Sequence, residues 1–170
     1  MKQFQEIDPL TIKNDPRVIA EIADDRDSRV TYYILIDDSH VIIANTTYYT
    51  DPDTNQSEWL HYQIEFPKKG LKWYLNTIKN KFFKTEAEGG LKKGQFEIKN
   101  IIDGEWLLVG RAMDADGHGG GGYCFYTLDR PRRPGSRLSK KYTFTDRFLF
   151  EHGFFDLLQS IADRIEAGEL

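Results

Sequence analysis

A short phrase that occurs twice constrains the fold of this chain more than any other feature. In each copy an aromatic-rich stretch leads into a glycine, at Gly70 and at Gly153, and then into residues with helical periodicity. Apolar side chains recur there at steps of four, three and four residues, a spacing that places them on one face of an α-helix. They are Leu71, Leu75, Ile78 and Phe82 in the first copy and Phe154, Leu158, Ile161 and Ile165 in the second. The pattern predicts a chain built from two similar halves.

Stretches rich in β-branched and aromatic residues precede each copy of the phrase and are typical of β-strands. Each half has four of them, predicted at residues 17–22, 29–36, 40–49 and 58–66 and at residues 95–101, 105–113, 123–128 and 140–145. The last strand is expected to continue to Phe150 past a turn at Asp146. Helices are expected over residues 68–84 and 151–167, and residues 1–16 are expected to form an arm that leads into the fold.

The order of these elements predicts the fold class. Two runs of four strands and a helix favour an α+β fold, in which antiparallel sheets carry helices packed on one side. Strands that follow one another without helices between them argue against a parallel, doubly wound sheet. We therefore expect a single domain, residues 1–170, with an internal repeat whose halves are residues 17–84 and 92–167. The sheet face opposite the helices is expected to be free for a ligand.

Composition narrows the class of protein. Hydrophobic residues make up 39% of the chain and aromatic residues 14%, which is typical of a globular protein. The single cysteine, Cys124, cannot form an internal disulfide and lies in an apolar stretch, so we predict a buried thiol. No apolar stretch approaches the roughly 18 residues that a membrane helix needs, and the first residues lack the apolar centre of a signal peptide. We expect a cytoplasmic protein without a membrane partner.

Charge is distributed unevenly along the chain, although the net charge is only −4. Residues 1–66 hold 5 basic and 13 acidic side chains, whereas residues 67–141 hold 16 basic and 8 acidic ones. The last segment, residues 142–170, holds 2 basic and 6 acidic side chains. A basic middle segment in an acidic protein indicates either a binding surface for an anionic partner or a lysine-rich solvated face.

Motifs for catalysis or metal binding do not emerge from the sequence. The glycine-rich stretch at 114–122 begins like a calcium loop, but Phe125 stands where that loop requires a glutamate. It leads into a strand rather than into the helix that a phosphate-binding loop requires, so we predict a long, flexible hairpin loop. His40, His61, His118 and His152 show no metal-type pairing. We predict no catalytic residue, no metal and no cofactor, with an enzyme or a small-molecule cavity as a third alternative.

Basic and aromatic residues of the second half form the strongest candidate site. Cations that follow a phosphate backbone, together with aromatic rings on which bases stack, are what binding of a single strand requires. The predicted phosphate contacts are Lys92, Lys93, Lys99, Arg111, Arg130, Arg132, Arg133, Lys140 and Lys141, and the predicted base contacts are Trp106 and Tyr123. Since side chains alternate along a strand, about half of the aromatic residues in these strands must belong to the core.

The layout resembles the Whirly and Pur-alpha group of single-stranded nucleic-acid-binding proteins over residues 17–167. The phrase at 62–71 is similar to that group in running from an apolar strand into a proline, a glycine and a helix. The stretch from Phe96 to Leu107 resembles the group's opening hairpin. The resemblance implies two repeats of four strands and a helix, binding of single-stranded DNA or RNA by a sheet face, and a homo-oligomer.

Two hypotheses about function follow. The first is a non-enzymatic protein that binds single-stranded DNA or RNA through a sheet face, basic loops and stacked aromatic rings. The alternative is a protein-interaction or assembly module without affinity for nucleic acid. In that case edge strands and aromatic faces pair with a second subunit, and the acidic and basic segments are complementary across the contact.

Overall fold

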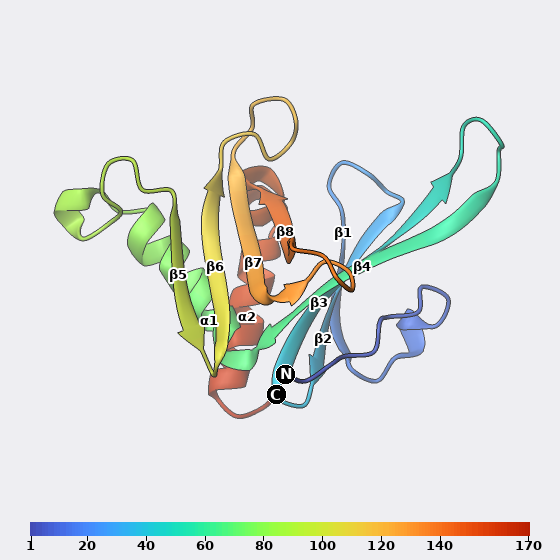
Figure 1. The fold of residues 1–170 in the computed structure, drawn as a ribbon, viewed down its shortest axis with the longest axis horizontal. Coiled ribbons are helices and arrows are strands. Elements are labelled where there is room, and N and C mark those ends of the chain that lie inside the picture. The colour runs from blue at the N-terminus through green and yellow to red at the C-terminus, as the bar shows by residue number, and fades with distance from the viewer. The chain divides into compact units, whose positions relative to one another are not determined.

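The structure, a computed structural model, describes residues 1–170 and contains two four-stranded antiparallel sheets (Figure 1). In each sheet the strands are neighbours in chain order, and a helix follows. The first set is β1 (Val18–Ala23), β2 (Val30–Asp37), β3 (His40–Thr50), β4 (Ser57–Pro67) and α1 (Lys68–Thr77). The second set is β5 (Glu97–Ile102), β6 (Glu105–Ala112), β7 (Gly122–Pro131), β8 (Ser139–Thr145) and α2 (Phe154–Glu166). The predicted α+β class and the internal repeat are confirmed.

The chain divides into two compact units that do not coincide with the halves expected from the repeat. Residues Met1–Glu65 form the first unit and residues Phe66–Leu170 the second. The helix α1 contacts α2, β5 and β6, so it belongs with the second sheet although it follows the first along the chain. The repeat therefore describes the order of the elements, whereas the packing assigns both helices to the second unit.

The N-terminal arm supplies part of the core of the first unit. Ile7 and Ile12 are 3% and 2% exposed, and they form a cluster with alternate side chains of β2 and β3. These partners share one face of the sheet, because Tyr33 is opposite Ala44 and Leu35 is opposite Ile42. They are Tyr33, Leu35, Ile42 and Ala44. The arm thus covers an apolar sheet face instead of only leading into the fold.

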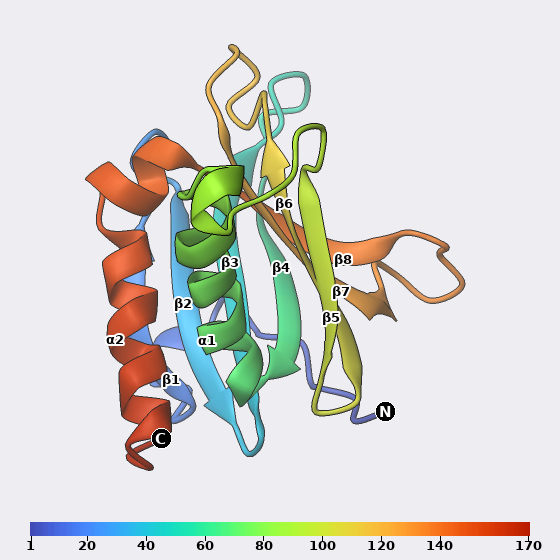
Figure 2. The same cartoon turned by 90° about the vertical axis from the view of Figure 1, so that its left-hand side faces the viewer.

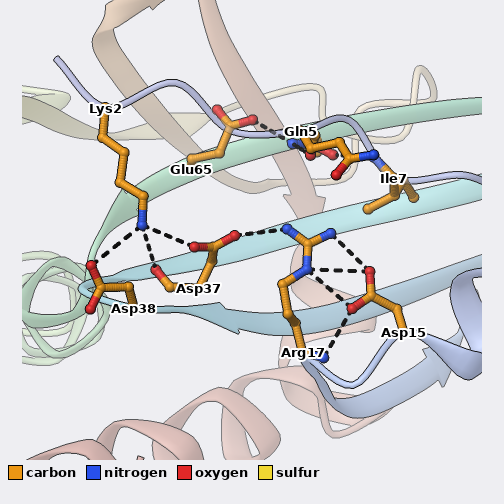
Figure 3. Close-up of polar contacts among 9 residues, drawn as sticks. Lys2, Gln5, Ile7, Asp15, Arg17, Asp37, Asp38 and Glu65 are labelled. Carbon is orange, nitrogen blue, oxygen red and sulfur yellow. Dashed lines mark hydrogen bonds and ion pairs between the residues drawn. The ribbon is translucent and has the colours of Figure 1, made fainter.

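Polar contacts fix the arm at both ends (Figure 3). The ammonium group of Lys2 lies 2.9 Å from a carboxylate oxygen of Asp37, whose other oxygen accepts a hydrogen bond of 2.8 Å from Arg17. Arg17 also pairs with Asp15 at 2.8 Å. Hydrogen bonds from Lys2 and Arg17 lower the pKa of the Asp37 carboxyl, and Arg17 lowers that of Asp15. These four side chains form the arm cluster.

The helices α1 and α2 lie side by side in the second unit, on one face of the β5–β8 sheet (Figure 2). Tyr74 of α1 stacks on Phe125 of β7 with ring centroids 4.5 Å apart and donates a hydrogen bond of 2.5 Å to the Tyr126 carbonyl. Phe154 of α2 meets Phe144 of β8 at 4.9 Å. These contacts show which face of the sheet the helices cover. The alternate residues of the same strands point to the other face.

The two copies of the repeated phrase begin their helices in different ways. Gly70 lies buried inside α1, where an added Cβ would come within 2.6 Å of Leu107 Cδ1, so this glycine allows close packing on β6. Gly153 has φ of +91° and precedes α2 as its N-cap, which favours glycine because of the backbone conformation. The sequence similarity of the copies therefore conceals two different structural roles.

One predicted strand end is wrong, and one predicted helix changes its type near its end. The strand β8 ends at Thr145 and does not continue to Phe150, because residues Arg147–Glu151 form a turn of π-helix. The Thr145 hydroxyl, at the end of the strand, accepts a hydrogen bond of 3.0 Å from the Phe148 amide in this turn. Residues Ile78–Phe82, predicted as part of a continuous helix, also form a π-helical turn. Short 3₁₀ turns occur at Ile12–Asn14 and Glu86–Glu88.

Candidate nucleic-acid interface

The second sheet carries a row of lysine, leucine, tyrosine and lysine on the face opposite its helices. Lys99 of β5 is opposite Leu108 of β6, Leu108 is opposite Tyr126 of β7, and Tyr126 is opposite Lys141 of β8. Phe125 points to the helix side, so Tyr126 and the row to which it belongs point away from the helices. Both edge strands therefore contribute a cation, and the two central strands contribute apolar or aromatic groups.

The neighbouring row adds a second ring to this face. Trp106 of β6 is 39% exposed, and Ile101, directly opposite it on β5, is 49% exposed. The Lys99 ammonium group lies 5.4 Å from the centroid of the Trp106 ring, and the Lys141 ammonium group lies 5.2 Å from that of Tyr126. Each aromatic ring is thus covered by a lysine from the nearer edge strand, an arrangement of the cation–π type. We call these six residues the lysine-capped face: Lys99, Ile101, Trp106, Leu108, Tyr126 and Lys141.

The spacing of these groups follows from sheet geometry. Adjacent strands lie about 4.8 Å apart, so the two lysine Cα atoms on β5 and β8 are separated by roughly 14 Å. Trp106 is two residues from Leu108, the partner of Tyr126, so the two ring-bearing residues are diagonal neighbours. Diagonal pairs have Cα atoms about 7–8 Å apart. Two aromatic surfaces at this spacing, flanked by a cation at each edge, can accept two successive unpaired bases and their phosphates.

Seven of the eleven predicted contact residues lie on this face or in exposed loops. Lys99, Trp106 and Lys141 belong to the lysine-capped face itself. Four further cations are exposed in the segments before β5 and after β7: Lys92, Lys93, Arg132 and Arg133. These four extend the positive charge beyond the sheet without contributing to a stacking surface.

Three of the predicted residues make internal contacts on the helix side or at the sheet end. Arg111 pairs with both carboxylate oxygens of Asp146, at 2.6 and 2.7 Å, and lies 4.7 Å over the ring of Tyr123, which is only 4% exposed. The hydrogen bond to Asp146 raises the pKa of the Arg111 guanidinium. Arg130 is 5% exposed and holds Glu105 with hydrogen bonds of 3.0 and 2.8 Å. Their charges are neutralised within the unit, so we leave them out of the candidate interface.

The remaining residue, Lys140, also belongs to the helix side. It is opposite Thr127 of β7, which in turn is opposite Leu107, the side chain that α1 approaches at Gly70. Lys140 is half-buried and makes interactions of its own. The strand alternation that turns Lys141 toward the open face turns Lys140 away from it.

Sequence reasoning missed Tyr126, Leu108 and Ile101. Alternation from Trp106 alone assigns Leu108 to the outer face, so this signal was present in the sequence. The choice between Tyr123 and Tyr126 depends instead on the register of β6 against β7. The loop between these strands sets that register, and its length alone does not reveal it.

Hydrogen bonds to two aspartates hold the glycine-rich loop between β6 and β7. One carboxylate oxygen of Asp116 accepts the amides of His118 and Gly120, both at 2.8 Å, and one of Asp114 accepts the amide of Gly119 at 2.7 Å. These backbone amides lower the pKa of the Asp116 carboxyl. The predicted long hairpin loop is therefore present, with an internal hydrogen-bond network that the sequence alone did not indicate.

No group of three or more His, Cys, Asp or Glu side chains is arranged to hold a metal ion. Cys124 is buried, as predicted, with its sulfur 3.2 Å from the hydroxyl oxygen of Thr143. None of the helices has the length and apolar character needed to cross a membrane.

Comparisons with known proteins do not assign this chain to a family. The chain matches no protein-family model, no curated protein and no solved structure. No comparison identifies a Whirly or Pur-alpha relative, so that similarity is one of layout, carried by the order of four strands and a helix in each repeat.

Proposed function

We propose that this protein binds single-stranded nucleic acid, DNA or RNA, on the lysine-capped face. The observation that carries the proposal is the pair of aromatic rings, Trp106 and Tyr126, each with a lysine ammonium group 5.4 or 5.2 Å from its centroid. A stacking surface and a cation within reach of it are the two components of a single-strand site. Here they occur twice, on adjacent strands of one sheet.

When nucleic acid binds, a base replaces the lysine that covers each aromatic ring. In the free protein the lysine covers the ring, a contact worth about 0.5–1 kcal/mol at an exposed position. A base that stacks on the ring contributes about 1–3 kcal/mol, and the displaced lysine is then free to pair with a phosphate of the same strand. The exchange is therefore favourable, and it requires a base with an uncovered face, which a duplex does not offer.

The charge of the second unit supports an anionic ligand, although the whole chain is acidic. Residues 66–170 carry 18 basic and 14 acidic side chains, whereas residues 1–65 carry 5 and 13. In the same unit, Arg132, Arg133, Lys92 and Lys93 are exposed in the segments before β5 and after β7. Such cations increase the encounter rate with phosphates and make affinity depend on salt.

A salt-dependent titration tests the proposal. Fluorescence anisotropy of labelled single-stranded DNA, single-stranded RNA and duplex DNA should show binding of a single strand at low salt, with affinity falling steeply as salt rises. Dilute protein in the nanomolar range keeps self-association out of the measurement. Undetectable binding to both single strands at low salt, or stronger binding to the duplex, overturns the proposal.

Two tryptophans of similar exposure provide a matched comparison. Trp106→Ala removes a ring of the lysine-capped face, and we expect affinity to fall about 5-fold to 100-fold. Trp59→Ala removes a ring that is 42% exposed on β4 in the first unit, and we expect unchanged affinity. Circular dichroism must show both variants folded. Equal effects of the two substitutions would exclude the second sheet as the specific site.

A further inference from the structure

The β3–β4 hairpin extends past the first sheet as a two-stranded ribbon (Figure 1). The pairing of β3 with β2 ends at Thr47, opposite Val30, and beyond Tyr48 only β4 remains as a partner. The tip is ordered by Asp51, one of whose carboxylate oxygens accepts the Asp53 amide at 2.8 Å. The tip is thus held by a side-chain hydrogen bond, and the ribbon contributes no side chain to the apolar cluster under the arm.

Large apolar side chains are exposed on both faces of this ribbon. Tyr48 and Trp59 are 43% and 42% exposed and lie with ring centroids 5.1 Å apart. Tyr49 and Leu60, their neighbours along the strands, are 37% and 44% exposed and point to the opposite face. Exposed tyrosine and tryptophan gathered on one protruding element are typical of a surface that binds another protein.

The charge of the ribbon indicates the charge of the surface that it binds. Residues 48–61 contain three acidic side chains, at Asp51, Asp53 and Glu58, and no lysine or arginine. An acidic surface repels the phosphates of nucleic acid and favours a cationic protein surface. We call residues 48–61 the acidic ribbon.

The chain itself carries a segment of complementary character between β7 and β8. Residues 131–138 contain three arginines and no acidic residue, and all three arginines are exposed. Leu138 is 64% exposed beside them, and Pro131 and Pro134 are exposed as well. The Arg132 amide donates a hydrogen bond of 2.7 Å to the Leu138 carbonyl, which closes the segment into a loop. We call residues 131–138 the arginine loop.

We propose that the acidic ribbon of one molecule docks on the arginine loop of a second copy of this chain. Three carboxylates face three guanidinium groups, while Tyr48 and Trp59 cover the exposed leucine and prolines of the loop. The contact joins two different surfaces, so it is head-to-tail and leads to a ring or an open chain of molecules. It goes beyond the proposed function and shares with it only the loop cations Arg132 and Arg133, since no residue of the ribbon or of the arginine loop belongs to the lysine-capped face.

Charge reversal on each side tests the contact. One variant carries Asp53→Lys and Glu58→Lys, which leaves Asp51 and the ordered tip intact, and the other carries Arg132→Glu and Arg137→Glu. Wild-type protein is expected to show a molar mass that rises with concentration in light scattering at low salt and falls at high salt. Each variant alone is expected to self-associate about tenfold or more weakly.

Mixing the two variants distinguishes this contact from a general effect of net charge. A lysine-bearing ribbon matches a glutamate-bearing loop, so an equimolar mixture, or one chain with all four substitutions, should recover the wild-type molar mass. Matched controls change the net charge equally at exposed sites elsewhere: Glu21→Lys with Glu151→Lys, and Lys13→Glu with Lys84→Glu. These controls should associate like the wild type.

Three results would overturn the inference. They are a monomeric wild type at every concentration at low salt, self-association that survives both reversals, and reversed variants that stay monomeric when mixed. Binding of single-stranded nucleic acid is measured separately on dilute protein, so either proposal can fail while the other stands. If both hold, an excess of oligonucleotide should reduce self-association, because Arg132 and Arg133 would then contact phosphates.

Discussion

The two sheets share a strand order and differ in what covers their faces. On the first sheet, a face lined by Tyr33, Leu35, Ile42 and Ala44 is covered by the N-terminal arm. On the second, both helices pack on one face, and the other is lined by lysines and aromatic rings, with Trp106 39% exposed. A repeated backbone layout therefore does not imply repeated surfaces, because alternate side chains decide what each face binds.

One ion pair of the first unit and one of the second differ in their exposure to solvent. The arm cluster of the first unit is partly open to solvent, with Arg17 and Asp37 side chains 25% and 24% exposed. The Arg130–Glu105 pair of the second unit is nearly closed to solvent, at 6% and 10%. Burial strengthens the mutual dependence of two charges, so loss of one partner should be costly only in the second unit.

The largest effect is expected from Glu105→Gln, which removes the charge of a carboxylate that pairs with the buried Arg130. Removal of one partner of a buried pair costs about 3–5 kcal/mol, so the free energy of unfolding should fall by that amount. Urea denaturation followed by circular dichroism measures it. The double variant Glu105→Leu with Arg130→Met should recover much of the loss. A change below about 1 kcal/mol for the single variant would contradict the role of burial.

The arm of the first unit provides the next test. Ile12→Ala creates a cavity between the arm and the first sheet, and we expect a loss of about 2–5 kcal/mol in the free energy of unfolding. Leu10→Ala serves as the control, because Leu10 is 77% exposed on the same arm and its truncation should change stability by less than about 0.5 kcal/mol. Equal effects would mean that the arm does not contribute to the core as described.

A single lysine of the open face should have a moderate effect on binding. Lys141→Gln removes the cation beside Tyr126, and affinity for a single-stranded oligonucleotide should fall about 5-fold at low salt. The slope of log affinity against log salt should decrease in magnitude by about 0.7, the value for one phosphate contact on a single strand. Lys13→Gln, on the exposed arm of the first unit, is expected to change neither quantity. An unchanged slope for Lys141→Gln would remove it from the interface.

The smallest effect is the acid sensitivity of the arm cluster. Hydrogen bonds from Lys2 and Arg17 lower the pKa of Asp37 below its ordinary value of 3.8, so the stabilisation is present above that value and is lost as pH falls through the folded-state pKa. Asp37→Asn should therefore cost less than about 1 kcal/mol at neutral pH, and its difference from the wild type should vanish once the pH is below the folded-state pKa of Asp37. Denaturation at a series of pH values measures this, and a difference that grows on acidification would contradict the assignment.

Local patterns in the sequence predicted the strands and helices. Features that depend on contacts between residues far apart in the chain were not predicted. Periodicity and β-branched stretches identified all eight strands and both helices, because these signals lie within a few residues of each other. The covered first sheet was missed, since Ile7 and Ile12 find their partners only through tertiary packing. The strand predicted to reach Phe150 was wrong, because residues Arg147–Glu151 form a helical turn soon after β8 ends at Thr145.

The candidate site was predicted only in part, for a related reason. Arg111 and Arg130 resemble surface cations in the sequence, and their carboxylates lie 35 and 25 positions away along the chain. The assignment of Tyr123 in place of Tyr126 reflects the same limit, because the register of β6 against β7 decides which tyrosine faces outward. Lys99 and Trp106, which were among the predicted contacts, do lie on the lysine-capped face. Alternation along a single strand is enough to assign such residues to one face.

The assignment of α1 to the second unit affects the timing of folding during synthesis. The first unit has all its residues once Glu65 has been added, whereas α1 is made next and packs against β5, β6 and α2, which end as late as Glu166. At the usual rate of translation the ribosome needs on the order of ten seconds to make that stretch. During this interval the apolar side of α1, which includes Leu71 and Leu75, lacks the residues that cover it in the folded protein. The nascent chain therefore exposes an apolar helical segment, the kind of surface that chaperones bind.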